Sequence, residues 1–179
     1  MKDKTDSAKK LVSLVVPFYN ESEGIGQLYD ATTAVFATLS EIDFEVVCID
    51  DGSSDDTLTK LIDLVDTDMR FRVIELSRNF GKEAALTAGI DSARGDAVIP
   101  FDADLQDPPE MIPKLIEQWG KGAEVVLACR VDRSSDAYLK QKTAKFFYVI
   151  HNWLSSTQIP NNVGDFRPVS YTHLTLPTN

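Results

Sequence analysis

Short apolar runs alternate with amphipathic segments along most of this sequence. The runs are rich in Val and Ile and predict β-strands. They lie at residues 11–16, 44–49, 71–76, 97–101 and 125–129. Between them, apolar residues recur every three or four positions and predict helices. These helices are expected over residues 25–39, 57–65, 83–93 and 110–119. Because strands separated by single helices form parallel sheets, we expect an α/β domain with a mostly parallel central sheet.

Charged side chains follow the ends of these strands. In parallel sheets, functional groups lie at the carboxyl ends of the strands. Five ionisable residues fall there or just beyond: Asp51, Lys82, Asp102, Asp104 and Arg130. This coincidence points to an active site more strongly than any one of the residues does alone.

The richest of these strand ends is residues 99–110, where an apolar run gives way to acids, an amide and two prolines. If residues 102–106 are extended, Asp102, Asp104 and Gln106 share one side of the chain. Carboxylate and amide oxygens suit a hard divalent cation, Mg²⁺ or Mn²⁺. The alternative is a solvated acidic turn that only caps the next helix, because Asp-rich turns are common.

A second acidic loop covers residues 50–56, at the end of the second predicted strand. A carboxylate pair followed by Gly and a helix start resembles a nucleotide-binding loop. The alternative is a turn in which Ser54 or Asp55 caps the helix over residues 57–65. Since both can hold at once, the functional interpretation rests on Asp51.

Charge limits the partners that the chain can have. The net charge of −10 repels a polyanion, so we expect no nucleic-acid partner. Residues 130–145 carry a local charge of +3, which suits an anionic partner there. The two cysteines, Cys48 and Cys129, each end an apolar run and indicate small buried side chains in a reducing compartment.

Residues 137–154 contain neither Pro nor Gly and combine lysines with large aromatic side chains. One interpretation is an amphipathic helix, over residues 137–155, that lies against anionic lipid with Phe146, Phe147 and Trp153 at the headgroups. The other is a helix that packs on the core and leaves its lysines in water. No run reaches the roughly 18 apolar residues that a spanning helix needs.

Several blocks in order resemble glycosyltransferase family 2, and within it the polyisoprenyl-phosphate branch of bactoprenol glucosyltransferases and dolichyl-phosphate mannose synthases. The matching blocks are Val16-Pro-Phe-Tyr-Asn-Glu21, Asp50-Asp-Gly-Ser53, Arg78-Asn-Phe-Gly-Lys82, Asp102-Ala-Asp-Leu-Gln-Asp-Pro-Pro-Glu110, Arg130 and Gly164-Asp-Phe-Arg167. A lone Asp-Xaa-Asp is weak evidence, but these blocks in this order are specific.

The resemblance implies a Rossmann-like GT-A fold that transfers a hexose, with inversion, from a nucleotide sugar such as UDP-glucose to undecaprenyl phosphate in a membrane. It places Pro17, Tyr19, Glu21 and Asp51 around the nucleoside, and Lys82, Asp102 and Ala103 in the rest of the donor site. It assigns a divalent cation to Asp102, Asp104 and Gln106, and the acceptor phosphate to Arg130 and Arg133. The catalytic residues that it implies are Asp104, Arg130 and Asp165.

The resemblance also sets the expected domain organisation. Residues 1–10 would be a flexible N-terminus, and residues 11–167 a truncated catalytic domain. The full-length parent would be an enzyme that modifies surface glycans such as O-antigen. It would act at the cytoplasmic face of the bacterial inner membrane and could form a homo-oligomer. Residues 168–179 depart from the family pattern, beginning with Pro168, and are expected to be foreign sequence.

Other functions stay open at this point. The chain could be a fragment that binds a nucleotide sugar and transfers nothing, or an enzyme of the mannose synthase kind that uses GDP-mannose. A dinucleotide oxidoreductase is disfavoured, because no Gly-Xaa-Gly-Xaa-Xaa-Gly follows the first strand.

Overall fold

The computed structural model describes residues 9–123, 125–126 and 169–170. These residues belong to the first of two compact units, and the second unit, residues 127–165, lies outside the described range. In the first unit, strands and helices alternate as the sequence predicts. The strands are β1 (Lys10–Phe18), β2 (Ile42–Asp50), β3 (Phe71–Glu75), β4 (Ala97–Pro100) and β5 (Val169–Ser170). The helices are α1 (Ile25–Phe36), α2 (Thr57–Thr67), α3 (Lys82–Ser92), the 3₁₀ turn η1 (Pro109–Met111) and α4 (Ile112–Gly120).

The strands form one sheet in the order β3-β2-β1-β4-β5. The pairs formed by the first four strands are all parallel, which confirms the expected sheet type. The fifth strand differs from the prediction. Of residues 125–129 only Val125 forms a described bridge, residues 127–129 lie outside the described range, and the short β5 pairs antiparallel with β4.

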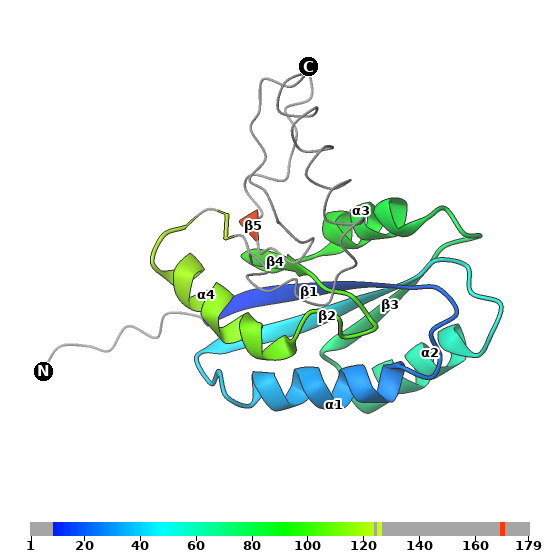
Figure 1. Cartoon of the computed structure of the whole chain (residues 1–179), viewed down its shortest axis with the longest axis horizontal. Helices are drawn as coiled ribbons and strands as arrows, with labels where there is room; N and C mark the ends of the chain where they lie inside the picture. The colour runs from blue at the N-terminus through cyan, green and yellow to red at the C-terminus, as the bar shows by residue number, and fades with distance from the viewer. Residues whose placement is uncertain (1–8, 124, 127–168, 171–179) are drawn as a thin grey trace, which may run out of the picture. The chain divides into compact units, whose positions relative to one another are not determined.

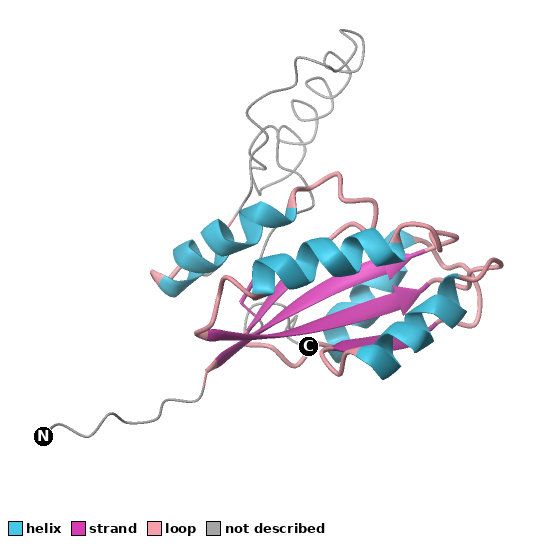
Figure 2. Ribbon diagram, turned by 90° about the horizontal axis from the view of Figure 1, so that it is seen from below, coloured by secondary structure: helices cyan, strands magenta, loops and turns pink. Residues whose placement is uncertain are grey.

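Helices cover both faces of the sheet, with α3 on one face and α1 and α2 on the other (Figures 1 and 2). The core under α3 includes Val15, Val47 and Ile49, which are fully buried. Because side chains alternate along a strand, the neighbouring Leu14, Val16 and Val46 point to the opposite face, and they too are fully buried. Burial on both faces explains why these strands are continuous apolar runs.

A buried polar group ties the amino ends of the central strands together. The Ser13 hydroxyl donates to Oε1 of Glu45 at 2.6 Å, and this carboxylate oxygen also accepts the backbone N–H of Arg94 at 2.6 Å. The N–H of Gly95 in turn donates to the Ser13 oxygen at 2.9 Å. This network fixes the turn between α3 and β4, at the end of the sheet opposite the candidate active site.

Two further expectations concern burial and membrane insertion. Cys48 is buried in β2 as predicted, and burial raises the pKa of its thiol to about 12. None of the helices in the described part of the chain is long and apolar enough to cross a bilayer.

Candidate active site

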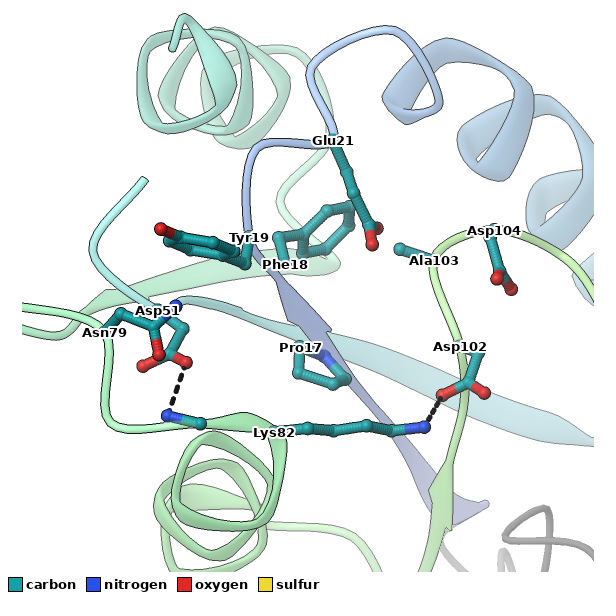
Figure 3. A pocket seen from close by; sticks show the side chains of 11 residues that line it. Pro17, Phe18, Tyr19, Glu21, Asp51, Asn79, Lys82, Asp102, Ala103 and Asp104 are labelled. Atoms are coloured by element: carbon teal, nitrogen blue, oxygen red, sulfur yellow. Dashed lines mark hydrogen bonds and ion pairs between the residues drawn. The ribbon is translucent and has the colours of Figure 1, made fainter. Parts of the chain in front are cut away.

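The carboxyl ends of the parallel strands surround a cavity of about 330 Å³ (Figure 3). Its size is at the low end of the range for small-ligand sites. It is lined by Pro17, Phe18, Tyr19, Glu21, Asp51, Asn79, Gly81, Lys82, Asp102, Ala103 and Asp104. The structure therefore brings together all of the donor-site residues expected from the sequence, together with Asp104.

The loop after β1 is held by the loop that precedes α2. Asn20 adopts a left-handed conformation with φ of 54°, which Asn tolerates better than most residues. Its backbone N–H donates to the Ser53 hydroxyl at 3.0 Å, and its side-chain oxygen accepts the N–H of Ser54 at 2.8 Å. The N–H of Glu21 donates to the Thr57 hydroxyl at 2.9 Å. These bonds place Glu21 at the cavity.

Three carboxylates and one ammonium group face each other across the cavity. Lys82 Nζ lies 2.7 Å from Oδ1 of Asp102, while Glu21 points toward Ala103 and Asp104 (Figure 3). Burial raises the pKa of Glu21, the charges of Asp104 and Asp102 raise it further, and Lys82 opposes the shift. Oε2 of Glu21 is buried and makes no hydrogen bond within the described residues. Burial and two neighbouring carboxylates thus both disfavour the ionised form of Glu21.

The segment after β4 differs from the extended conformation on which the metal prediction was based. The N–H of Leu105 donates to the Asp102 carbonyl at 3.3 Å, and Leu105 has φ of 56°, so the chain turns here. The turn still brings two of the predicted ligands together. Gln106 Nε2 donates to Oδ2 of Asp104 at 2.7 Å and its backbone N–H donates to Oδ1 at 3.1 Å. Gln106 itself lies outside the lining of the cavity.

The opposite side of the cavity is organised by Asp51, which is 3% exposed. One of its carboxylate oxygens accepts the N–H of Phe80 and the other that of Gly81, each at 2.8 Å. The helix-capping alternative for this loop holds in part: the residue that precedes α2 is Asp56, whose side chain makes no capping bond, but Asp55 does bond to the first turn. Asp55 accepts the N–H of Thr57 at the start of α2 at 3.0 Å, and bonds from Thr57, chiefly its hydroxyl, lower the pKa of Asp55 to about 2.

The donor set suits a hard cation only in part. Glu21, Asp102 and Asp104 offer oxygen ligands, and one buried oxygen of Glu21 has no hydrogen-bond partner within the described residues. However, in residues 9–123, 125–126 and 169–170 no three acidic, His or Cys side chains are grouped closely enough to hold a metal ion. A cation at this site would need further oxygens from a ligand, as Mg²⁺ commonly does.

Several predicted residues lie outside the described residues. These are Arg130, Arg133 and Asp165, the 137–155 helix, residues 1–8 and most of 168–179. Conversely, Phe18, Asn79 and Gly81 line the cavity but were not predicted as site residues. All three occur within the sequence blocks quoted above, so their position next to Tyr19 and Lys82 was the available signal.

The fold and the acidic cavity at the carboxyl ends of its strands agree with a match to a family of enzymes. Residues 13–174 match the sequence model of Glycosyl transferase family 2, and the chain belongs to that family.

Among curated proteins, the chain is 52% identical over 159 residues to the bactoprenol glucosyl transferase of Shigella phage SfV. The aligned residues make up 89% of this chain and 52% of that protein. It is 51% identical over the same length to the prophage bactoprenol glucosyl transferase homolog of Escherichia coli, covering 89% of this chain and 52% of that protein. The chain thus spans about half the length of the curated relatives that it matches.

Solved structures agree on the fold. Glucosyl-3-phosphoglycerate synthase from Mycobacterium tuberculosis, in complex with Mn²⁺, UDP-glucose and phosphoglyceric acid, superposes with a TM-score of 0.65 and 21% identity, covering 92% of this chain and 58% of that one. A mannosyltransferase from Pyrobaculum calidifontis, in complex with GDP-Man and Mn²⁺, superposes with a TM-score of 0.57 and is 22% identical in sequence. The match covers 69% of this chain and 37% of that one. The GT-A fold expected from the resemblance is therefore confirmed.

Proposed function

We propose that this chain carries the donor site of an inverting hexosyltransferase that moves glucose from UDP-glucose to undecaprenyl phosphate. The observation that carries the proposal is the cluster of Glu21, Asp102 and Asp104 opposite Lys82, at the carboxyl end of a parallel sheet. The relatives named bactoprenol glucosyl transferases support glucose and a polyprenyl acceptor.

A nucleoside diphosphate brings negative charge into an acidic cavity. At about 4 Å and an effective dielectric of 20, each pair of like charges costs about 4 kcal/mol. We assign a divalent cation, Mg²⁺ or Mn²⁺, to Asp102 and Asp104, with donor oxygens completing its shell. Gln106, expected from the sequence as a third ligand, lies outside the cavity lining and instead holds the Asp104 carboxylate. When bound, such a cation stabilises the charge that develops on the departing diphosphate. The Mn²⁺ in the M. tuberculosis and P. calidifontis complexes supports this assignment.

The remaining lining residues orient the donor. Lys82 starts α3, where its ammonium group and the positive end of the helix both favour phosphate. Tyr19, 46% exposed, and Pro17 offer apolar surface for the nucleoside. Asp51 retains carboxylate lone pairs that can accept a bond from the ribose or the base. Ala103, which has a small side chain, leaves room between Glu21 and Asp104.

The acceptor half of the reaction rests on residues outside the described range. Arg130 and Arg133 would hold the acceptor phosphate by charge-assisted hydrogen bonds. An anionic phosphate needs little help from a base, so Asp165 would orient it more than deprotonate it. Attack from the face opposite the diphosphate inverts the anomeric carbon. The 137–155 helix would rest on the lipid surface, at the cytoplasmic face of the inner membrane.

Transfer assays test the proposal. The full chain is incubated with Mn²⁺ and labelled UDP-glucose, with and without undecaprenyl phosphate in vesicles, and GDP-mannose is the competing donor. We expect label in the lipid fraction only with UDP-glucose and acceptor together. Arg130→Ala should retain UDP affinity and lose transfer.

Other results would separate the alternatives. Binding of UDP without transfer would identify a donor-binding fragment, and transfer from GDP-mannose would identify an enzyme of the mannose synthase kind. Absence of both binding and transfer would refute the proposal.

A further inference from the structure

The loops that follow β2 and β3 approach each other more closely than most side chains would allow. Gly52 has φ of 67°, and a Cβ at this position would lie 2.5 Å from the carbonyl carbon of Arg78 and 2.7 Å from the nitrogen of Asn79. Both neighbours are backbone atoms, which cannot rotate away. Glycine therefore permits a contact between these two loops that no other residue would tolerate.

Next to Gly52, the Asp51 carboxylate fastens the second loop by its main chain. Its two oxygens accept the consecutive N–H groups of Phe80 and Gly81, each at 2.8 Å. Asp51 is itself held by its N–H, which donates to the Phe18 carbonyl at 2.8 Å. The carboxylate is thus buried at the end of the sheet and directed at two backbone groups 29 and 30 residues further along the chain.

The residue after these two N–H groups is Lys82, whose ammonium group reaches across the cavity to Asp102 (Figure 3). Gly81 has φ of 96°, so the backbone turns sharply between the anchored N–H groups and the first residue of α3. A shift of Phe80 and Gly81 would therefore move the base of the Lys82 side chain. The ion pair links the end of β4 to the same anchor.

We propose that Asp51 is a positioning residue for Lys82: its carboxylate fixes the main chain at Phe80 and Gly81 and thereby aims the ammonium group at the donor's diphosphate. This goes beyond the nucleoside contact implied by the family resemblance, and the two roles are compatible because each oxygen has a second lone pair. The part that concerns the diphosphate rests on the proposed function; the anchoring part does not.

Amide hydrogen exchange in the ligand-free full chain tests the anchoring. In Asp51→Asn one oxygen becomes an NH₂ group that faces a backbone N–H, so exchange at Phe80 and Gly81 should accelerate about tenfold or more. The matched control is Asp50→Asn, because the Asp50 carboxylate is equally buried but accepts the N–H of Ser53 at 3.1 Å instead. It should leave the two amides unchanged.

Unchanged exchange at Phe80 and Gly81 in a folded Asp51→Asn protein would overturn the anchoring. Protection of the amides of Val46 and Val47 in β2 reports whether the variant is folded. If Asp51→Asn does not fold, Gly52→Ala is the second variant, since it pushes the loops apart while keeping the carboxylate. It should accelerate exchange at the same two amides, and a folded Gly52→Ala protein with wild-type exchange there would also contradict the proposal.

A double-mutant cycle tests the link to Lys82. UDP affinity in the presence of Mn²⁺ is measured for the wild type, Asp51→Asn, Lys82→Met and the double variant. If Asp51 acts through Lys82, its substitution should weaken binding about tenfold in the wild type and clearly less in the Lys82→Met background, where only the direct nucleoside contact remains to be lost. Equal losses in the two backgrounds would show that Asp51 acts on the donor only directly and would refute the positioning role. A wild type that binds no UDP would refute the proposed function and leave the exchange result standing.

Discussion

Lys82 and Asp102 form an ion pair that spans the candidate active site, with Nζ of Lys82 2.7 Å from Oδ1 of Asp102. Lys82 starts α3 and Asp102 follows β4, so the pair joins a helix that covers the sheet to the end of one of its strands. Burial and two neighbouring carboxylates raise the pKa of Glu21, and the same ammonium group opposes this rise. Removing it should therefore affect both ligand binding and the charge state of the cavity.

Lys82→Met should weaken UDP binding about tenfold, because a charge-assisted bond to phosphate contributes roughly 1.5–3 kcal/mol and part of it is screened by solvent. Calorimetric titration with Mn²⁺ present measures this change. The matched control is Lys121→Met, which removes an exposed ion pair in which Nζ of Lys121 lies 2.6 Å from Oε1 of Glu117. This variant should leave UDP affinity unchanged. Equal affinity in Lys82→Met and wild type would exclude a diphosphate contact for this lysine.

Asp104→Asn should abolish the dependence of UDP binding on Mn²⁺, since it removes a carboxylate that both faces the cavity and accepts two bonds from Gln106. The measurement is a UDP titration at increasing Mn²⁺ concentration. Asp56→Asn, on the exposed surface before α2, is the control and should behave as wild type. A Mn²⁺-dependent titration that survives in Asp104→Asn would contradict the metal assignment.

Glu21→Gln should raise the melting temperature at pH 7. Because the pKa of Glu21 is raised above its ordinary value of 4.5, the folded protein holds this proton more tightly than the unfolded chain. Its contribution to stability is therefore complete below pH 4.5 and is lost as pH rises through the folded-state pKa. Gln cannot ionise and avoids that loss, so the difference in melting temperature between Glu21→Gln and wild type should shrink toward pH 4.

Thermal unfolding followed by circular dichroism from pH 4 to 8, without metal or nucleotide, checks this prediction. The exposed Glu23→Gln is the control and should change the melting temperature little at any pH. A lower melting temperature for Glu21→Gln at pH 7 would show that the ionised carboxylate stabilises the fold.

Two helical glycines should respond oppositely to alanine. A Cβ on Gly89 would clash with Ile49 Cδ1 and Val15 Cγ1, so Gly89→Ala should destabilise the protein by roughly 1–3 kcal/mol through overpacking between α3 and the sheet. Gly26 in α1 has no atom within 4 Å of such a Cβ, and Gly26→Ala should stabilise by roughly 0.5–1 kcal/mol. Urea unfolding of both variants measures the difference, and the same sign of change in both would be inconsistent with this packing.

Ser13→Ala should destabilise the fold by roughly 1–3 kcal/mol, because it leaves the N–H of Gly95 and one Glu45 oxygen with fewer partners in a buried site. Urea unfolding again provides the measurement. Ser40→Ala is the matched control: its hydroxyl donates to Glu41 at 3.4 Å on the exposed surface, and its loss should cost less than about 0.5 kcal/mol. Equal stability of the Ser13→Ala protein and wild type would show that water replaces the hydroxyl.

The sequence predicts β1, β2 and β4 well because each contains an apolar run buried on both faces, such as Val12–Val16 in β1. β3 is only partly buried, and β5 was not predicted. The sequence also predicts which carboxylates lie together at the cavity, since Asp51, Asp102 and Asp104 follow strand ends. Local patterns say less about conformation inside the loops. The period-two argument for Asp102 and Gln106 assumed an extended chain, and the left-handed Leu105 turns it instead.

Contacts between loops that lie far apart in the chain could not be predicted from the sequence either. Nothing near Asp51 indicates that its carboxylate binds N–H groups 29 and 30 residues away, because main-chain donors carry no signature of residue type. The same holds for the close approach of Gly52 to Arg78. A glycine in a turn is common, and only the three-dimensional neighbour explains why it is needed.

The position of β1 at the centre of the sheet has a consequence for biosynthesis. Its partner β4 pairs Ala97 with Val12, so that side of the central strand stays open until Ala97 has left the ribosome. At about 5–20 residues per second, this exposure lasts roughly 4–17 s. A nascent chain interrupted before Ala97 would keep an apolar, unpaired strand edge, which makes such products natural clients for chaperones and proteases.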